Sequence, residues 1–341
     1  MSIKDKLQII LITYNRAKHV KKTFEQFFFE GSPVSDCEFI VQDNNSTDNT
    51  REIVEEFAKT HSNVKYVKNK YNLGLSGTIA RAMEYANKEY VWIIGDDDIY
   101  DFSNFDEVEK AINNDEKMIC ISRYAIPDDK KDNIAYQLFQ LTFITGGIYS
   151  TSLFNDTTIR NAFDNIYTLF PHLLPIIKFI NDGGKIYVTD KAVADNGFKL
   201  EEKDCSYIRG IKNASELSKR TVFMTWILGY CNTVNLLNNK GLVSECIERA
   251  ISYPDIFKTL DNFFEYLLYL ENNHISYFYE IFPLLNENKQ KQYIESKPQL
   301  ETWKNRVSKI SATVTFKEAV WLLFYKIKKI FVKAVKNVLN K

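Results

Sequence analysis

The chain has 341 residues, 45% of them hydrophobic and 26% charged, which is an ordinary composition for a globular protein. Its 44 basic and 44 acidic residues cancel, so the overall charge gives no reason to expect a nucleic-acid partner. A chain of this length can bury a substantial core, and we expect one domain of ordinary size plus an appendage.

The cysteines and the apolar stretches bear on where the chain resides. Cys37, Cys120, Cys205, Cys231 and Cys246 are scattered without a CxxC pair, which favours free thiols in a reducing cytoplasm. The apolar stretch from Leu7 to Ile12 is too short for a signal peptide and is predicted to be a strand. No apolar run reaches the length of about 18 residues that a spanning helix needs.

The first part of the chain, to about residue 125, alternates β-rich runs with helical patterns, as in a sheet built from βαβ units. The expected strands are Leu7–Thr13, Glu38–Asp43, Val64–Lys68, Tyr90–Gly95 and Met118–Ser122. The expected helices are Lys18–Phe29, Asp48–Lys59 and Ser76–Ala86. The polar residues of interest therefore collect at the C-terminal ends of strands, where ligands bind in open α/β sheets.

The remainder of the chain is less regular and then mainly helical. A loop at Asp128–Asp132, a helix at Leu169–Asn181 and a strand at Lys185–Val188 are expected to complete the first domain. Further helices are expected at Glu216–Leu237, Ile256–Glu271 and Phe316–Leu339. We therefore predict an α/β domain at residues 1–200, a helical domain at 201–315 and a basic amphipathic helix at 316–341.

Three consecutive carboxylates, Asp96, Asp97 and Asp98, end the apolar strand that contains Trp92. Adjacent like charges repel, so a divalent cation is a natural partner for them. Asp96 and Asp98 can aim at one site if the turn curls, with Asp97 directed outward or bonded to the loop. Such oxygen ligands suit Mg²⁺ or Mn²⁺, which also bind diphosphate oxygens. The alternative is an acidic turn that caps the following helix.

Three polar loops follow other predicted strands. They are Thr13-Tyr14-Asn15-Arg16, Asp43-Asn44-Asn45-Ser46-Thr47-Asp48 and Asn72-Leu73-Gly74. Their short polar side chains suit a nucleotide base and ribose at a strand-end crevice, and the glycine lets the backbone approach a ligand closely. Taken singly, each loop is also explained by turn and cap chemistry.

The order of these motifs resembles family 2 glycosyltransferases of the GT-A fold, a mixed α/β sheet flanked by helices. The resemblance covers about residues 5–125 and continues loosely to about 195. It implies that Thr13 and Asp43 contact the base and ribose of a nucleotide sugar. The other residues implied to lie around the donor are Tyr14, Asn15, Arg16, Asn72 and Gly74. The family's DxD element would be Asp96-Asp97-Asp98, whose outer members serve the ribose and the metal-bound diphosphate, with Asp98 as the principal metal ligand.

The sequence departs from the family pattern in two places. The family loop commonly reads DDGS or DNxS, whereas Asn44-Asn45-Ser46 here contains no second acid, which leaves the base open and uridine favoured. The Glu-Asp pair that supplies the catalytic base in many inverting members is absent around Leu169–Leu174. His172 stands near the missing Asp, and an imidazole with a pKa of ~6.5 can accept a proton near neutrality. We predict His172 as the base, with Asp164 and Asp195 in reserve. The alternative is that His172 caps or packs against the helix.

The resemblance also implies a mechanism. It is inversion by a single displacement, in which a base removes the acceptor's proton while Mn²⁺ or Mg²⁺ stabilises the leaving nucleoside diphosphate. Gly146 and Gly147 fall where the family often places a glycine-rich turn beside the donor sugar. An ordinary loop is the alternative for this pair.

The C-terminal segment from Lys317 to Lys341 holds seven lysines and one acid, interleaved with large apolar residues. Helical spacing gathers residues such as Phe324 and Ile327 on one face and lysines such as Lys329 and Lys333 on another. This pattern predicts a helix that lies in an anionic membrane surface. A docked terminal helix and an oligomerisation face are the alternatives.

The predicted function is the transfer of a sugar from a nucleoside diphosphate donor, with a UDP-sugar favoured, to a hydroxyl of a glycan or lipid-linked acceptor. Such an enzyme would serve bacterial surface polysaccharide or glycoconjugate synthesis, at the inner face of the cytoplasmic membrane. Two other classes remain open, a noncatalytic nucleotide-binding membrane scaffold and a sugar nucleotidyltransferase. No nucleic-acid partner is expected, and the sequence leaves the oligomeric state open.

Overall fold

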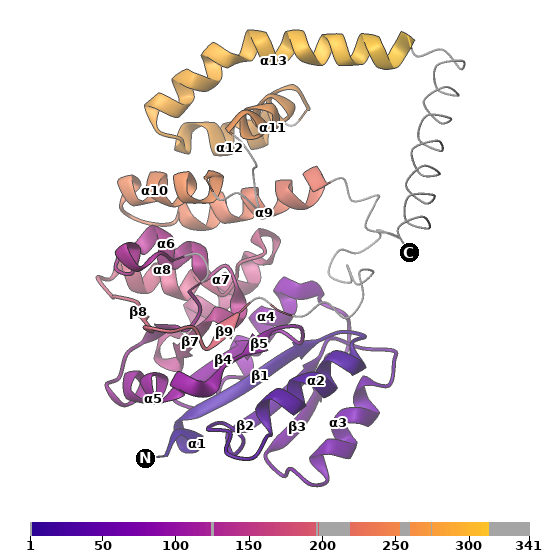
Figure 1. Ribbon diagram of the computed structural model, residues 1–341, viewed down its shortest axis with the longest axis vertical. Coiled ribbons are helices and arrows are strands. Elements are labelled where there is room, and N and C mark those ends of the chain that lie inside the picture. The colour runs from indigo at the N-terminus through magenta and orange to yellow at the C-terminus, as the bar shows by residue number, and fades with distance from the viewer. Residues whose placement is uncertain are drawn as a thin grey trace, which may run out of the picture.

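A seven-stranded mixed sheet organises the N-terminal part of the chain, in the strand order β3-β2-β1-β4-β7-β6-β8 (Figure 1). The computed structural model describes residues 2–123, 126–195, 197, 219–252, 260–273 and 275–313. The sheet contains β1 Leu7–Thr13, β2 Glu38–Asp43, β3 Val64–Lys68, β4 Tyr90–Ile94, β6 Met118–Cys120, β7 Gly147–Ser150 and β8 Tyr187–Val188. Strands β3, β2, β1 and β4 are parallel, and β7 lies antiparallel between β4 and β6. A separate antiparallel pair is formed by β5 Ile99–Tyr100 and β9 Ala194–Asp195.

Strand β1 is buried along its whole length because helices cover both faces of the sheet. Leu7, Ile9 and Leu11 belong to one apolar cluster, whereas Ile10 and Ile12 belong to the other. A parallel strand covered on both faces needs apolar residues at successive positions, which explains the run LQIILIT.

Two groups of helices cover the two faces. The helices of this part are α1 Ile3–Lys6, α2 Ala17–Phe27, α3 Thr50–Ala58, α4 Gly74–Tyr85, α5 Phe105–Asn113, α6 Ile134–Gln140, α7 Asp156–Asp164 and α8 Leu173–Asn181. Apolar residues of α2, α3 and α5 pack in the cluster of Leu7, Ile9 and Leu11. Residues of α4, α6, α7 and α8 pack in the cluster of Ile10 and Ile12. Because both groups of helices lie on the faces of the sheet, the edge formed by the carboxyl ends of the parallel strands stays open for a site.

The C-terminal helices stack on the side of α6 and α8 (Figure 1). They are α9 Lys219–Val234, α10 Lys240–Ile251, α11 Leu260–Asn273, α12 Ile275–Ile281 and α13 Glu287–Thr313. Ile227 and Val234 of α9 share an apolar cluster with Ile10 of β1, so these helices continue the core of the sheet. A Cβ added at Gly229 of α9 would lie 1.8 Å from the carbonyl oxygen of Thr168. Only glycine fits there.

Several predicted elements are present with small shifts of their ends. The predicted strands begin and end within two residues of β1, β2, β3, β4 and β6. The helix predicted from Leu169 begins only at Leu173, because Leu169 has a φ of 69° that an α-helix cannot contain. The predicted boundary near residue 200 and the predicted helix Phe316–Leu339 lie outside the described residues. In the described part of the chain, no helix has both the length and the apolar character needed to cross a bilayer.

The glycine pair at 146–147 is not an ordinary loop. Gly147 begins β7, a central strand that the sequence pattern does not predict. Of the four residues of β7, Ile148 and Tyr149 favour a strand whereas Gly147 disfavours one, so the local signal is too short to identify it. The pairing with β4 and β6 decides the conformation instead, and a Cβ at Gly147 would lie 2.7 Å from Met118 Cε. Helices α5, α6 and α7 are also absent from the prediction.

Candidate active site

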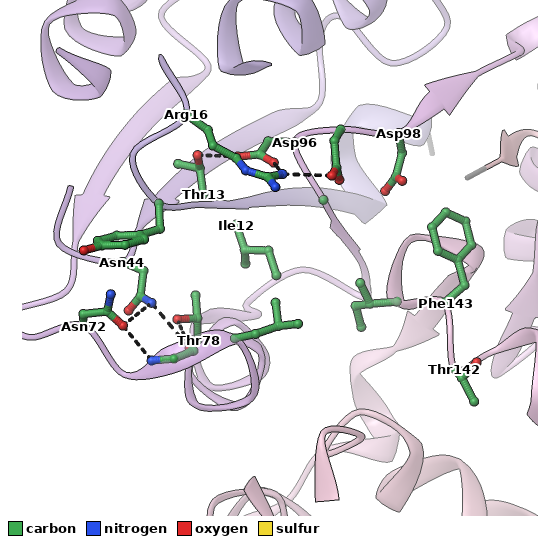
Figure 2. Close-up of a pocket in the computed structure, with 16 residues that line it drawn as sticks. Ile12, Thr13, Arg16, Asn44, Asn72, Thr78, Asp96, Asp98, Thr142 and Phe143 are labelled. Carbon is green, nitrogen blue, oxygen red and sulfur yellow. Dashed lines mark hydrogen bonds and ion pairs between the residues drawn. The ribbon is translucent and has the colours of Figure 1, made fainter. Parts of the chain in front are cut away.

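A pocket of about 280 Å³ opens at the carboxyl ends of β1 and β4 (Figure 2). Its lining comes from five loops: Ile12, Thr13, Tyr14 and Arg16; Asn44; Asn72, Gly74, Leu75 and Thr78; Gly95, Asp96, Asp97 and Asp98; and Thr142, Phe143 and Ile144. Three of the four polar motifs singled out in the sequence therefore meet in one cavity, together with Asn44 from the fourth. Their common position follows from the parallel strands, whose carboxyl ends share one edge of the sheet.

Arg16 and Thr13 hold the first carboxylate of the acidic turn. Thr13 Oγ1 donates to Asp96 Oδ2 at 2.6 Å, and Arg16 Nη1 donates to Asp96 Oδ1 at 2.8 Å. The same Nη1 lies 2.8 Å from Asp97 Oδ2. Both oxygens of Asp96 thus already accept hydrogen bonds from the chain, whereas the side chain of Asp97 is 44% exposed.

Asp98 is buried and held by a residue of another loop. Thr145 Oγ1 donates to Asp98 Oδ2 at 2.5 Å and accepts from the backbone N–H of Gly95 at 2.9 Å. A Cβ at Gly95 would lie 2.9 Å from Asp98 Oδ2 and 3.4 Å from Asp97 Oδ1. The second and third carboxylates therefore both curl back over Gly95, which leaves room for them because it has no side chain.

Burial makes these carboxylates unusually basic. It raises the pKa of Asp96 to about 6, although the charge of Arg16 and the hydrogen bond from Thr13 act in the opposite direction. Burial also raises the pKa of Asp98 to about 7, against the hydrogen bond from Thr145. For Arg16, burial opposes the charged form, but Asp96 and Asp97 outweigh it and raise the pKa above its ordinary value. Perturbed pKa values of this kind, caused by burial in a cleft, mark the acidic turn as a candidate functional site.

Carboxamides form the opposite end of the pocket. Asn44 Nδ2 donates to Asn72 Oδ1 at 3.0 Å, and Asn44 Oδ1 accepts from Leu73 N at 2.8 Å. Asn72 Oδ1 also accepts from Gly74 N at 2.8 Å, and Gly74 has a φ of 72° that favours glycine. Asn44, which begins the stretch that lacks the family's second acid, thus fixes the loop that enters α4.

Asp43 and Asn15, which are predicted from the sequence to contact the donor, do not line the pocket and are hydrogen-bonded to other residues of the chain. Asp43 is 0% exposed, and its carboxylate accepts from Ser46 N at 2.7 Å and from Tyr66 Oη at 2.5 Å. Asn15 donates its backbone N–H to Ser46 Oγ at 2.8 Å, and its side chain accepts from Thr47 N. Both residues brace the loop after β2 behind the pocket wall.

The three candidate bases occupy different environments, and none of them lines the pocket. His172 is 1% exposed, and its Nε2 lies 3.0 Å from the carbonyl oxygen of Leu141. Because a carbonyl only accepts, Nε2 carries the proton, and the buried Nδ1 has no hydrogen-bond partner among the described residues. Burial lowers the pKa of His172 to about 4. This environment fits the alternative of a packed histidine at the start of α8.

The two reserve carboxylates are exposed. Asp164 ends α7, whereas Asp195 ends β9, whose partner strand β5 begins directly after Asp98. Nearby, a Cβ at Gly197 would lie 1.4 Å from the carbonyl oxygen of Asp97. The chain around Asp195 therefore passes close to the acidic turn.

The sequence pattern does not single out Thr145, Phe143 or Gly197. Their contacts join segments about 50 or 100 positions apart, and no local motif reports such contacts. Gly146 and Gly147, which are predicted from the sequence to lie beside the donor sugar, do not line the pocket. Gly146 is closely packed, because a Cβ added there would lie 3.1 Å from the Cβ of Ser122. In the parts of the chain that the structure describes, no group of three or more His, Cys, Asp or Glu side chains is arranged to hold a metal ion.

Comparison with known proteins agrees with the motif order. The family described as Glycosyl transferase family 2 matches residues 8–188. An uncharacterized glycosyltransferase of Mycoplasma pneumoniae is 25% identical over 132 residues, which are 38% of this chain and 44% of that protein. A GalNAc(5)-diNAcBac-PP-undecaprenol beta-1,3-glucosyltransferase of Campylobacter jejuni is 32% identical over 94 residues, which are 27% of this chain and 30% of that protein. The matches thus span less than half the length of these curated relatives.

A solved structure resembles the fold over most of its length. S. aureus TarS 1–349 in complex with UDP-GlcNAc has a TM-score of 0.56 and 17% sequence identity, over 86% of this chain and 92% of that chain. A likeness at this level of identity concerns the fold alone. It confirms the predicted GT-A architecture, a mixed sheet flanked by helices and followed by a mainly helical region.

Proposed function

The chain belongs to glycosyl transferase family 2, and from that premise we propose that it transfers a sugar from a UDP-sugar to a hydroxyl of a glycan or lipid-linked acceptor. The observation that carries this proposal is one pocket with a carboxamide end, an acidic centre and an apolar far wall. A nucleotide sugar has three parts that match these in order: a base with its ribose, a diphosphate and a sugar. The UDP-GlcNAc bound to a protein of the same fold supports a UDP-sugar.

The proposed donor runs across the pocket from Asn72 to Phe143. Figure 2 shows Asn44, Asn72 and Thr78 on one side, Thr142 and Phe143 on the other, and Arg16 with the carboxylates between them. The base and ribose would lie near the carboxamides, which offer both donors and acceptors. The diphosphate would lie at the acidic turn, and the sugar would lie against Phe143.

Asp97 and Asp98 are proposed to hold Mn²⁺ or Mg²⁺ together with diphosphate oxygens. Both carboxylates curl over Gly95, and hard oxygen ligands are those that these cations prefer. Asp96, which the sequence suggests as a ligand, is proposed to fix Arg16 and Thr13 instead, because both of its oxygens are engaged. A bound cation would supply positive charge for the leaving diphosphate.

The chain's own residues would orient the substrates, stabilise the leaving diphosphate and accept the acceptor's proton. Arg16 places a permanent positive charge beside the diphosphate position, where negative charge develops as the sugar leaves. The acceptor hydroxyl would attack the anomeric carbon from the face opposite the diphosphate, which inverts that centre. We propose Asp195 as the base that takes its proton, because this carboxylate is exposed and close in the fold to the acidic turn. His172 and Asp164 are the other candidates.

The acceptor is proposed to be a lipid-linked saccharide or another surface-glycan precursor. The name of the Campylobacter jejuni relative includes an undecaprenol-linked acceptor, which supports this class of substrate. The basic segment at 316–341 supports a peripheral position at the inner face of the cytoplasmic membrane.

The test is sugar transfer by Asp98→Asn, with the exposed Asp129→Asn as the matched control. We expect Asp98→Asn to keep a cooperative unfolding transition and to lose transfer, whereas Asp129→Asn keeps wild-type turnover. In a separate assay, Asp195→Asn should lower kcat far more than donor affinity. Unchanged turnover of Asp98→Asn, or full wild-type activity in excess chelator, would contradict the cation-assisted mechanism.

A further inference from the structure

Thr145 connects the acidic turn to the far wall of the pocket. We propose that Thr145 is a positioning residue that holds the Asp98 carboxylate and the wall formed by Thr142, Phe143 and Ile144 as one unit. The inference rests on the proposed function, because it concerns the side of the pocket where the donor sugar would lie.

The hydrogen bonds of Thr145 leave its hydroxyl one orientation. The backbone N–H of Gly95 only donates, so Thr145 Oγ1 must accept the bond of 2.9 Å that joins them. The single hydroxyl proton is therefore available for Asp98 Oδ2, which lies 2.5 Å away. Thr145 is 0% exposed and Asp98 is 4% exposed, so water does not compete effectively for either bond. One oxygen of Asp98 is fixed in this way, and the other can turn toward a ligand in the pocket.

The backbone of Thr145 is held independently of its side chain. Trp92 Nε1, in the buried strand β4, donates to the carbonyl oxygen of Thr145 at 2.8 Å. Removal of the hydroxyl would leave this bond in place. A variant without the hydroxyl therefore tests the link to Asp98 rather than the location of the loop.

The other end of the wall is also held. His172 Nε2 donates to the carbonyl oxygen of Leu141, the residue before the three that line the pocket. The wall thus lies between two fixed points, Leu141 and Thr145. Because Thr145 also holds Asp98, a sugar that fits poorly against Phe143 would disturb the carboxylate beside the diphosphate. This coupling would make turnover, and not only affinity, depend on the donor sugar.

The experiment compares Thr145→Val, which removes the hydroxyl at nearly constant volume, with Thr145→Ser, which keeps it. Thr189→Val is the matched control, because Thr189 is 0% exposed and donates to Lys191 O at 2.7 Å but does not line the pocket. The measurements are kcat and KM for transfer, the Kd of UDP with Mn²⁺, and the melting temperature. We expect Thr145→Val to lose roughly 10–100-fold in kcat/KM, as outer partners of metal ligands commonly do. Thr145→Ser should recover most of this loss.

Two results would overturn the proposal. One is a Thr145→Val enzyme whose kcat/KM equals that of Thr189→Val. The other is a Thr145→Ser enzyme as defective as Thr145→Val, which would indicate a steric role. If the valine variant does not fold, Thr145→Ala removes the same hydroxyl, and a folded alanine variant with wild-type turnover overturns the proposal equally. Failure of the proposed function is a different result, in which the wild-type chain transfers no sugar from any UDP-sugar.

Discussion

Arg16 Nη1 donates to Asp96 Oδ1 at 2.8 Å, so that the loop after β1 neutralises a carboxylate at the end of β4. The Arg16 side chain is only 11% exposed and that of Asp96 is 5% exposed, so the pair has little access to water. The site therefore carries its own counter-charge. A divalent cation and the guanidinium would act on the same acidic turn.

Arg16→Gln should destabilise the fold. Loss of one partner of a buried ion pair commonly costs about 3–5 kcal/mol, because the remaining charge stays buried. The cost should shrink toward pH 5, since the pKa of Asp96 is raised to about 6 and its carboxyl can take up a proton. Urea denaturation with and without Mn²⁺ measures the effect, and the cation should recover part of the loss.

The control for this variant is Arg51→Gln, which breaks an exposed ion pair with Glu55. Such surface pairs contribute only about 0–1 kcal/mol. Equal free energies of unfolding for the two variants would show that Arg16 is not the counter-charge of the acidic turn.

Asn44→Asp should weaken nucleotide binding. The amide of Asn44 donates to Asn72 Oδ1 at 3.0 Å, and a carboxylate there would face an acceptor instead of donating to it. The loop before α4 should then loosen. Calorimetric titration with UDP and Mn²⁺ measures the loss, which we expect to be about tenfold, the effect of roughly 1.4 kcal/mol. Asn45→Asp adds the same charge one residue away and outside the pocket lining, so wild-type affinity for both variants would refute the prediction.

The strands β1, β2, β3, β4 and β6, and the meeting of the polar loops that follow the parallel strands, could be predicted because both follow from local patterns, whereas the central strand β7 could not. The run from Leu7 to Ile12 identifies a strand covered on both faces, and polar residues after such strands must meet at one edge. The roles of single residues could not be predicted in the same way. Asp43 is paired with Tyr66, and Asp98 with Thr145, across segments that are far apart in the chain. Whether such a carboxylate faces a ligand or a neighbouring side chain depends on tertiary contacts.

The fold should become less stable in mild acid because His172 is protonated more readily in the unfolded chain than in the folded one. Burial lowers its pKa from 6.5 to about 4, so between these values the unfolded chain binds a proton that the folded chain does not. The contribution of His172 to the free energy of unfolding, about 3 kcal/mol in total, is complete above pH 6.5 and is lost as the pH falls toward 4. Denaturation of the wild type and of His172→Gln across this range measures it.

The difference between the two proteins is the relevant quantity in that experiment. Asp96 and Asp98 have raised pKa values, so each gives the opposite trend, with stability greatest in acid and lost as the pH rises through the folded pKa. Their contributions are common to both proteins and cancel in the difference. A difference that does not change between pH 7 and pH 4 would mean that His172 titrates normally, as an accessible catalytic base would.

Gly229→Ala should detach α9 from the segment Ile166–Thr168. An added Cβ would lie 1.8 Å from the carbonyl oxygen of Thr168, which is backbone and cannot move aside cheaply. Alanine favours a helix over glycine by about 1 kcal/mol, so a net loss of stability would show that the contact outweighs helix propensity. Gly241→Ala in α10 is the control, because its Cβ would meet only the side chain of Asn239 at 3.2 Å. Equal or increased melting temperatures for both variants would contradict the close approach of α9.

Deletion of residues 317–341 should release the protein from anionic vesicles. The segment carries seven lysines among large apolar residues, so that both charge and apolar burial would favour a membrane surface. Attachment there would confine the enzyme and a lipid-linked acceptor to one surface and raise their effective concentration. Sedimentation with vesicles of anionic lipid measures the binding, and donor hydrolysis, which depends on the N-terminal pocket, should persist after the deletion.

The salt dependence separates the two contributions to membrane binding. Charge attraction is screened as ionic strength rises, whereas apolar burial is not, so the full-length chain should keep a residual affinity in high salt. A variant with Lys326, Lys329, Lys333 and Lys336 changed to Gln keeps the apolar face and three of the seven lysines, so its preference for anionic over neutral vesicles should fall without vanishing. Equal vesicle binding by the truncated and full-length chains would remove the basis for a membrane-bound acceptor, because the tail would then have no part in attachment.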